Sequence, residues 1–345
     1  MKRSIPVLYY HRIGSPDGIH LSIPTALFEK QIGFLSKRGF KSIGMQTLYR
    51  HISGAEPVNF PAFAVTFDDG FRDNLANAFP VLRKYKCRAS IFPVSSLVRS
   101  DNAAVRDPPR DFNQAHLAAR GGDCGDFLSW KELSEMASTG LVEFHSHTRS
   151  HNQVFIGNTV LGVFPDTDAH WGIVSAYGFP LPNGSWPVFP RTAGFLAPAW
   201  KPEFKKIDSA GTSWMALFKQ KCEGSPHQVP TNWFSVETQV SYVARVRADL
   251  KESKESFAGF HPSGCDLLCW PWGVFNPLLI ELAREVGYSG ALATSTGANL
   301  PGNDPFSIHR FPVRKPDMVR FALSVWLRSA PALAEVYRPF RNWGR

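Results

Sequence analysis

Two patterns of apolar residues alternate along this chain, one typical of strands and one typical of helices. Short apolar runs with the length and the Val/Phe content of buried strands alternate with longer stretches whose apolar positions recur as in a helix. This alternation predicts an α/β fold with parallel strands. The strand-like runs lie near residues 5–10, 62–67, 89–93, 141–144, 266–270 and 289–294. The helix-like stretches lie around residues 26–38, 72–86, 129–139, 235–256, 276–286 and 316–328.

Two acidic residues come directly after the strand-like run at 62–67. Neighbouring side chains of a strand point to opposite faces, so Asp68 and Asp69 can serve one site only where the strand ends and the backbone turns, which Gly70 permits. Carboxylates this close resist joint ionisation unless a cation lies beside them. The pattern indicates a metal on one carboxylate and proton transfer by the other, and an ordinary Asp-Asp-Gly turn is the alternative.

Histidines follow the apolar run at 141–144 in the same way. The four-residue spacing of His147 and His151 puts both rings on one face of a helical turn, and a structured loop could do the same. His145 is an alternative ligand, and a chance surface pair is a further alternative. One aspartate with two imidazoles is a ligand set for zinc or a similar divalent ion, with positions left for water and a substrate carbonyl. The sequence thus predicts a metal-dependent hydrolase.

The segments TFDDG at 66–70 and HTRSH at 147–151 resemble two motifs of the polysaccharide deacetylases. This family shares the nodulation-protein-B homology domain and comprises metal-dependent carbohydrate de-N-acetylases and esterases. The resemblance implies a distorted (β/α)7-type barrel and assigns the general base to Asp68. Zinc is the expected ion, with cobalt and nickel as alternatives. The metal ligands that the resemblance implies are Asp69, His147 and His151.

The segment LCWPWGVFN at 268–276 resembles a third motif of the family, a loop that lines the acetyl-binding site. In the family the backbone N–H after the proline helps to hold the oxyanion, which implies this role for Trp272. Many members also place an arginine shortly before that proline, where it pairs with the catalytic aspartate. Residues 267–270 offer none, so Arg310 is the candidate partner of Asp68, and an exposed Arg310 is the alternative.

The N-terminal segment 5–13 resembles the branch of the family that deacetylates poly-N-acetylglucosamine and carries its catalytic histidine in the first strand. This resemblance implies that His11 is the general acid, and a structural histidine is the alternative. The C-terminal third of the chain also offers His261 and His309. His309 is the second candidate for the acid, because its segment 306–313 resembles a late motif of the family.

One catalytic domain over residues 1–345 is expected, with an insertion at about 155–233 that the resemblance does not cover. The tryptophans of this insertion could form a glycan subsite or lid, or could form the insertion's own small core. A second, polar insertion at 99–126 is predicted as a surface loop, and a basic tail is expected at about 329–345. The tryptophans of the first insertion are Trp171, Trp186, Trp200, Trp214 and Trp233.

With 345 residues and 43% hydrophobic content, the chain can bury a sizeable core. Its 38 basic and 29 acidic residues give a formal net charge of +9, which favours anionic partners. Basic residues are spread along the chain without a nucleic-acid motif, so we expect no nucleic-acid binding. Apolar residues and arginines at 318–326, together with the tail, predict either peripheral contact with an anionic membrane or a helix packed on the barrel.

Residues 1–3 lead directly into a predicted strand, so we expect no secretory signal, no membrane span and a cytoplasmic location, with peripheral attachment at the inner membrane as an option. Five cysteines without a framework pattern fit reduced thiols. In that location a lipid-linked or nucleotide-linked sugar is expected as the substrate more readily than a finished polymer. Two other functions stay open: an amidohydrolase for a small non-sugar amide, and a non-catalytic glycan-binding module.

Overall fold

The chain forms two compact units. The computed structural model describes residues 4–16, 21–164, 170–178, 186–203, 227–260, 266–295, 297–314 and 317–336. The first unit comprises residues 1–115, 124–150 and 249–345, and the second comprises residues 116–123 and 151–248. The single catalytic domain expected from the sequence stays a prediction.

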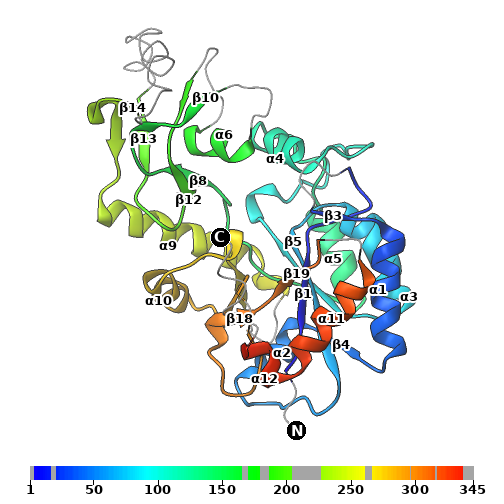
Figure 1. Ribbon diagram of the computed structural model, residues 1–345. Coiled ribbons are helices and arrows are strands. Elements are labelled where there is room, and N and C mark those ends of the chain that lie inside the picture. The colour runs from blue at the N-terminus through cyan, green and yellow to red at the C-terminus, as the bar shows by residue number, and fades with distance from the viewer. Residues whose placement is uncertain are drawn as a thin grey trace. The chain divides into compact units, whose positions relative to one another are not determined.

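A sheet of parallel strands forms the centre of the first unit (Figure 1). Its strands are β1 (Val7–Tyr10), β4 (Lys41–Ile43), β5 (Ala62–Asp69), β6 (Ala89–Pro93), β7 (Val142–Phe144) and β19 (Phe311–Pro312). The order is β19, β1, β5, β6 and β7, and β4 pairs with the start of β5. In this register Tyr10 lies opposite Phe67, and Asp68 lies opposite Phe92. The chain therefore leaves β1, β5 and β6 at the same edge of the sheet.

A second parallel sheet of this unit consists of β16 (Leu267–Cys269), β17 (Gly290–Ala293) and β18 (Ile308–His309). A bridge between Ser146 and Leu268 connects the chain after β7 to β16. Apolar residues of both sheets, among them Val7, Phe92 and Leu292, form one buried cluster. The predicted α/β fold with parallel strands is thus confirmed. A short parallel pair, β2 (Arg12–Ile13) and β3 (Ser22–Ile23), follows β1.

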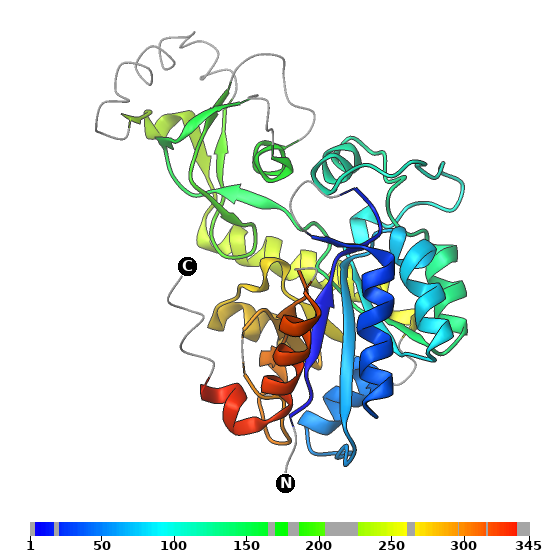
Figure 2. The same cartoon turned by 45° about the vertical axis from the view of Figure 1, so that its right-hand side comes forward.

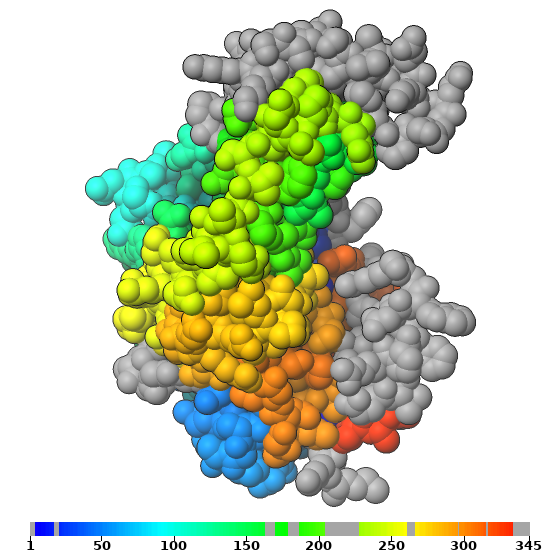
Figure 3. All heavy atoms as spheres, turned by 90° about the vertical axis from the view of Figure 1, so that its left-hand side faces the viewer, coloured from blue at the N-terminus to red at the C-terminus, as the bar shows by residue number. Residues whose placement is uncertain are grey.

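Four of the described helices pack in the main hydrophobic core, on the side of the central sheet that faces away from this cluster, whereas α2 packs in the cluster itself. Phe28 and Ile32 of α1 join Leu82 of α3 and Phe67 of β5 in the main hydrophobic core. Figures 1 and 2 show α1 and α3 side by side along the sheet, and Figure 3 shows α10 on the outer surface of the unit. The helices of this unit are α1 (Thr25–Lys37), α2 (Met45–Ile52), α3 (Phe79–Lys84), α5 (Trp130–Ser138), α10 (Pro277–Val286), α11 (Met318–Ser329) and α12 (Pro331–Val336). Two further helices, α4 (Phe112–Arg120) and α9 (Gln239–Ser256), contain residues of both units.

Local sequence signals set several of the helix ends. The Ser129 side chain accepts a hydrogen bond from the backbone N–H of Glu132, and the Glu132 carboxylate accepts one from the N–H of Ser129, which is the capping box of α5. Asn276 caps α10, and Gly287 ends it with φ of 91°. Every predicted helix-like or strand-like stretch contains a helix or a strand of that kind.

Short antiparallel strand pairs make up much of the second unit. Its elements are β8 (Gln153–Phe155), β9 (Thr159–Val160), β10 (Gly162–Phe164), α6 (Trp171–Tyr177), β11 (Trp186–Val188), β12 (Arg191–Ala193), β13 (Trp200–Pro202), β14 (His227–Gln228) and β15 (Phe234–Val236). Trp186 belongs to a buried cluster with Phe155 and Phe189, and Trp200 and Trp233 pack against it. These three tryptophans therefore contribute to a core of the second unit, one of the two roles predicted for them.

One element contradicts the sequence prediction. Residues 99–126 were expected to form a surface loop, but Phe112–Arg120 is helical and buries His116 completely. None of the helices in the described part of the chain combines the length and the hydropathy that a bilayer crossing requires. Several residues named in the sequence analysis lie outside the described residues: His261, Trp214 and the part of the basic tail from residue 337 onward.

Candidate metal and catalytic site

Asp68 and Asp69 end β5, and both are buried. Asp69 has φ of 70° and Gly70 has φ of 81°, so the backbone turns sharply at the end of the strand. A Cβ atom on Gly70 would lie 2.7 Å from the Cβ of Pro93, so only glycine fits there without a shift. This turn releases the second carboxylate from the strict alternation of the strand.

Three buried side chains converge at this turn. The carboxylate of Asp69 and the imidazoles of His147 and His151 offer ligand atoms that all lie within 4.8 Å of one another. His145, the alternative ligand, instead places Nε2 3.5 Å from Glu143 Oε2 and stacks on Phe92. The structure therefore brings together the three side chains that the sequence motifs predicted, and His145 is not one of them.

The tautomer of His147 suits a metal ligand. Its Nδ1 lies 2.8 Å from the carbonyl oxygen of Cys269, which can only accept, so Nδ1 carries the proton. In the neutral ring Nε2 is then the nitrogen that can bind a metal, and it lies 3.5 Å from Asp69 Oδ1. Such a hydrogen bond from the rear nitrogen fixes the ring orientation in metal sites.

Asp249 of α9 holds the loop that carries the two histidines. Its Oδ1 and Oδ2 accept hydrogen bonds from the backbone N–H groups of Arg149 and Ser150, at 2.9 and 3.1 Å. The hydroxyl groups of Ser253 and Ser146 lie 2.7 Å apart, in hydrogen-bond contact. The sequence reasoning missed Asp249, although an acidic residue on the otherwise buried side of a long helix was a usable signal.

A group of aromatic and basic residues surrounds His151. The ring of Trp171 lies 5.3 Å from that of His151, and the buried ring of His116 stacks on Trp171 at 4.6 Å. Arg120 donates a hydrogen bond to the His151 carbonyl oxygen at 3.3 Å and lies over the Trp171 ring. The sequence analysis considered Trp171 only as part of the insertion. His116 and Arg120 lie in the segment 99–126, which was expected to be a loop.

Arg310 forms a bidentate ion pair with Asp68. Nη1 lies 2.7 Å from Oδ1 and Nη2 lies 3.0 Å from Oδ2, and both side chains are buried. Burial acts to raise the pKa of Asp68, but Arg310, with His147 and His11, outweighs it, so this pKa lies below its usual value. The structure thus places Arg310 where the sequence named it as the candidate partner, and Asp68 is held in its ionised form.

Cys269 lies against this ion pair. Its Sγ accepts a hydrogen bond from Arg310 Nη2 at 2.8 Å and lies 3.6 Å from Asp68 Oδ1. Burial raises the pKa of the Cys269 thiol well above its usual value, so the sulfur stays protonated and neutral. Asp68, His147 and Cys269 also converge, but the carboxylate and the sulfur of this group are both engaged by Arg310.

The two candidates for the general acid have different surroundings. Burial lowers the pKa of His11, while the charges of Asp69 and Asp68 act to raise it, so this ring lies within electrostatic reach of both carboxylates. His309 follows Ile308 in β18, and its Nδ1 lies 2.7 Å from the hydroxyl oxygen of Ser295. Electrostatic interactions therefore connect His11 with the two aspartates, and a hydrogen-bond contact connects His309 with Ser295.

Strained backbone is concentrated in the predicted motifs. Trp272, in the turn Pro271–Gly273, has φ of 57°. Thr148 and His151 have φ of 63° and 47°. With Asp69, they make four of the five described non-glycine residues with positive φ. Such strain persists where surrounding contacts hold it and gathers at functional sites.

Residues 55–166 match a family model described as polysaccharide deacetylase. The chain is 23% identical over 282 residues to the poly-beta-1,6-N-acetyl-D-glucosamine N-deacetylase of Escherichia coli (strain K12). This alignment covers 81% of this chain and 32% of that protein. It is 31% identical over 173 residues to the protein of the same name from Staphylococcus epidermidis. This alignment covers 46% of this chain and 52% of that protein.

Among solved structures, the BpsB deacetylase domain from Bordetella bronchiseptica aligns with a TM-score of 0.56 and 22% identity, over 90% of this chain and 96% of that chain. This likeness concerns the fold. The chain spans between a third and about half of the length of the two curated relatives.

Proposed function

We propose that this chain, whose residues 55–166 match a polysaccharide deacetylase model, is a metal-dependent hydrolase that removes N-acetyl groups from an amino sugar of a glycan or glycan precursor. One observation carries the proposal. The carboxylate of Asp69 converges with His147 and His151, while its neighbour Asp68 stays outside this group in a buried pair with Arg310. Two adjacent carboxylates thus have two different roles available to them.

A divalent ion fits the first group. One carboxylate and two imidazoles, one of them with its tautomer fixed, form a donor set that zinc prefers. We propose that Asp69, His147 and His151 hold zinc, with cobalt or nickel as alternatives. Such an ion supplies a Lewis acid that polarises an amide carbonyl and makes water more acidic.

Asp68 is the proposed general base. Arg310 keeps it ionised at neutral pH, so it can take a proton from the water that attacks the acetamide carbon. The same ion pair lowers its basicity, and it also fixes the direction of the carboxylate. Cys269, against both groups, fills the space around the pair without adding charge.

His11 is the proposed general acid, with His309 as the second candidate. As the C–N bond breaks, the protonated imidazole gives its proton to the leaving sugar nitrogen, and acetate and a free amine are the products. The backbone N–H of Trp272 is the proposed donor to the oxyanion. Removal of one such donor costs about 3 to 4 kcal/mol of barrier in other hydrolases.

The substrate we propose is a β-1,6-linked N-acetylglucosamine polymer, by similarity to the named relatives. A lipid-linked or nucleotide-linked N-acetylated sugar is the second substrate class. We further propose that the parallel strands close into a distorted barrel that forms one catalytic domain. The cytoplasmic location stays a prediction from the sequence, which fractionation of the native cells tests.

Acetate release tests the proposal. The purified chain, loaded with zinc, is incubated with β-1,6-linked N-acetylglucosamine oligomers, a nucleotide-linked N-acetylglucosamine and a small non-sugar acetamide. We expect release from the oligomers, with no release by the Asp68→Asn variant. Turnover of the acetamide alone would support a small-molecule amidohydrolase instead, and binding of oligomers without any release would support a glycan-binding module.

A further inference from the structure

Helix α11 has an apolar face that is exposed. Its inner face packs into the core through Phe321 and Val325, which are 4% and 2% exposed. On the outer face Val319, Leu323 and Trp326 are 78%, 52% and 59% exposed, and their spacing of four and three residues puts them on one side of the helix. Three large apolar side chains gathered in this way indicate a contact surface.

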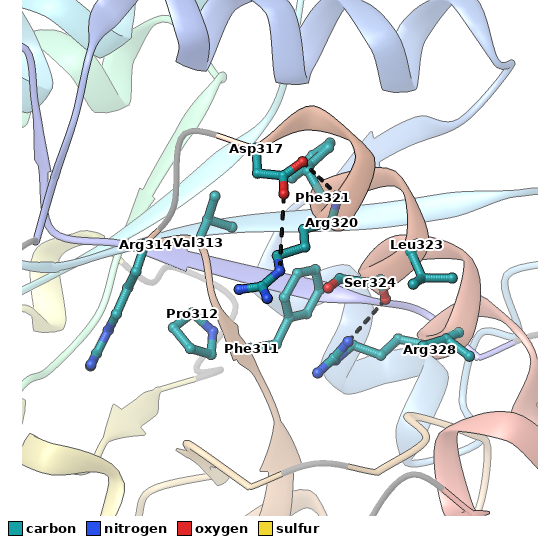
Figure 4. A pocket seen from close by; sticks show the side chains of 11 residues that line it. Phe311, Pro312, Val313, Arg314, Asp317, Arg320, Phe321, Leu323, Ser324 and Arg328 are labelled. Atoms are coloured by element: carbon teal, nitrogen blue, oxygen red, sulfur yellow. Dashed lines mark hydrogen bonds and ion pairs between the residues drawn. The ribbon is translucent and has the colours of Figure 1, made fainter. Parts of the chain in front are cut away.

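A cavity of about 510 Å³ lies beside this face, between α11 and residues 311–314, which include β19 (Figure 4). Arg314, Arg320 and Arg328 line it, with Asp317 as the one acidic side chain among its lining residues. The Nε atom of Arg320 lies 3.9 Å from Oδ2 of Asp317, and both side chains are exposed to solvent, so this ion pair neutralises little charge. Arg328 lies 4.3 Å from the centre of the Phe311 ring.

A second cavity, of about 550 Å³, lies between α1 and Met318, the first residue of α11. Lys30 and Lys37 line it together with Glu29. Five cationic residues and two carboxylates therefore line the two cavities that border α11. The apolar face lies next to a surface with excess positive charge.

An anionic lipid surface fits this combination. A helix that lies in the membrane interface places apolar and Trp side chains at the acyl boundary and cationic side chains among the phosphates. A second copy of this chain fits less well, since a two-fold contact would bring the same arginines together. Cavities of this size can receive the phosphate head groups that such a surface presents.

We propose that the outer face of α11, with the two cationic cavities beside it, is a peripheral docking surface for a bilayer that contains anionic phospholipid. None of the residues that form it belongs to the proposed catalytic set. Membrane docking is therefore testable separately from acetate release, and either one can fail alone.

Sedimentation with vesicles tests the docking surface. The full chain is mixed with vesicles of phosphatidylcholine alone or of phosphatidylcholine with phosphatidylglycerol, at low and at high salt. We expect binding to the mixed vesicles at low salt, little binding to the neutral ones, and release at high salt. Equal binding to both kinds of vesicle, or to neither, would overturn the proposal.

Matched variants locate the surface. Leu323→Glu with Trp326→Glu is expected to abolish vesicle binding, whereas Val240→Glu, at a valine that is 80% exposed on α9, is its control. Arg320→Ala is expected to weaken binding about fivefold, the effect of one cation near an anionic surface. Arg88→Ala, at another exposed arginine, is its control. Unchanged melting temperatures and acetate release confirm that the variants fold.

Two outcomes would contradict the lipid assignment. If inorganic phosphate at low concentration binds the chain and displaces it from vesicles at constant ionic strength, the cavities are sites for a free anion. If light scattering shows a dimer that the Leu323→Glu variant loses, the apolar face is an interface between copies. In both cases the membrane proposal is wrong.

Discussion

The two regions that supply the proposed metal ligands are built differently. Asp69 comes from the end of β5, where strands on both sides and the Arg310 pair fix the chain. His147 and His151 come from a loop, and this loop depends on contacts from distant segments, such as those of Asp249. The sheet itself positions Asp69, whereas residues around the loop position His147 and His151.

This difference predicts where substitutions act. Changes around the carboxylates, other than at the proposed ligand Asp69 itself, should alter chemistry while the backbone stays in place, because β5 lies in the centre of the sheet. Changes around the histidine loop should alter metal affinity, because residues 148–151 lie in no strand and are held by contacts such as those of Asp249. The predictions below test this contrast.

The largest effect is expected from His147→Ala. It removes an imidazole from the proposed ligand set, so both bound zinc and turnover should fall to background. Removal of a residue that only hydrogen-bonds to a metal ligand costs up to ~100-fold in metal affinity. Removal of the ligand itself should cost more. Metal analysis and acetate release measure it. His145→Gln is the control, since that ring faces Glu143, and equal loss in the two variants would contradict the assignment.

His11→Gln should come next. Loss of a general acid lowers kcat by ~10²–10⁴-fold, with metal content unchanged. In the parent chain kcat should fall as pH rises through the pKa of His11, and burial places this pKa below that of an exposed histidine. The variant should lack this limb of the pH profile. His309→Gln should keep it, and the reverse result would make His309 the acid.

Arg310→Lys tests the carboxylate side. Lysine keeps the charge but cannot bind both oxygens of Asp68. The pKa of Asp68 should rise towards its usual value, so the loss of kcat/KM on acidification should begin at higher pH. Unfolding free energy should fall by ~1.5–3 kcal/mol, as for one lost charged hydrogen bond. Bound zinc should not change, and a pH profile identical to the parent's would contradict the role of Arg310.

Asp249→Asn should have the smallest effect. It replaces one acceptor of the histidine loop with an amide nitrogen, which cannot accept from the N–H of Ser150 or Arg149. Zinc affinity should fall about tenfold, the lower end of the effect of outer partners. Competition with a chelator measures it. A fall in kcat at saturating zinc, with unchanged affinity, would place Asp249 in the chemistry instead.

Much of the first unit could be predicted because its longer helices and strands carry their own periodic patterns, whereas α2 and the short strands β4, β18 and β19 were not predicted. Asp68 and Asp69 were found for the same reason, since they end an apolar run. Residues 112–120 were expected to be a loop because their polar composition hides a helix that buries Phe112 and His116. Tertiary contacts, rather than local pattern, decide such a segment.

The supporting residues of the site could not be predicted in full. Asp249 lies about 100 residues after the loop that it holds, and no local pattern connects the two. Trp171 lies in the insertion, where its contact with His151 depends on the fold of the second unit. Arg310 could be named as the candidate partner of Asp68, because residues 267–270 lack the arginine that many members of the family have there. Its bidentate geometry required the structure.

The most direct test is a zinc titration of the parent chain, Asp68→Asn and Asp69→Asn by calorimetry, with acetate release measured on the same samples. We predict that Asp68→Asn binds one zinc ion with the parent's affinity and has no turnover, while Asp69→Asn loses zinc binding and turnover together. Equal loss of zinc in both variants, or loss in Asp68→Asn alone, would contradict the division of roles between the two adjacent carboxylates.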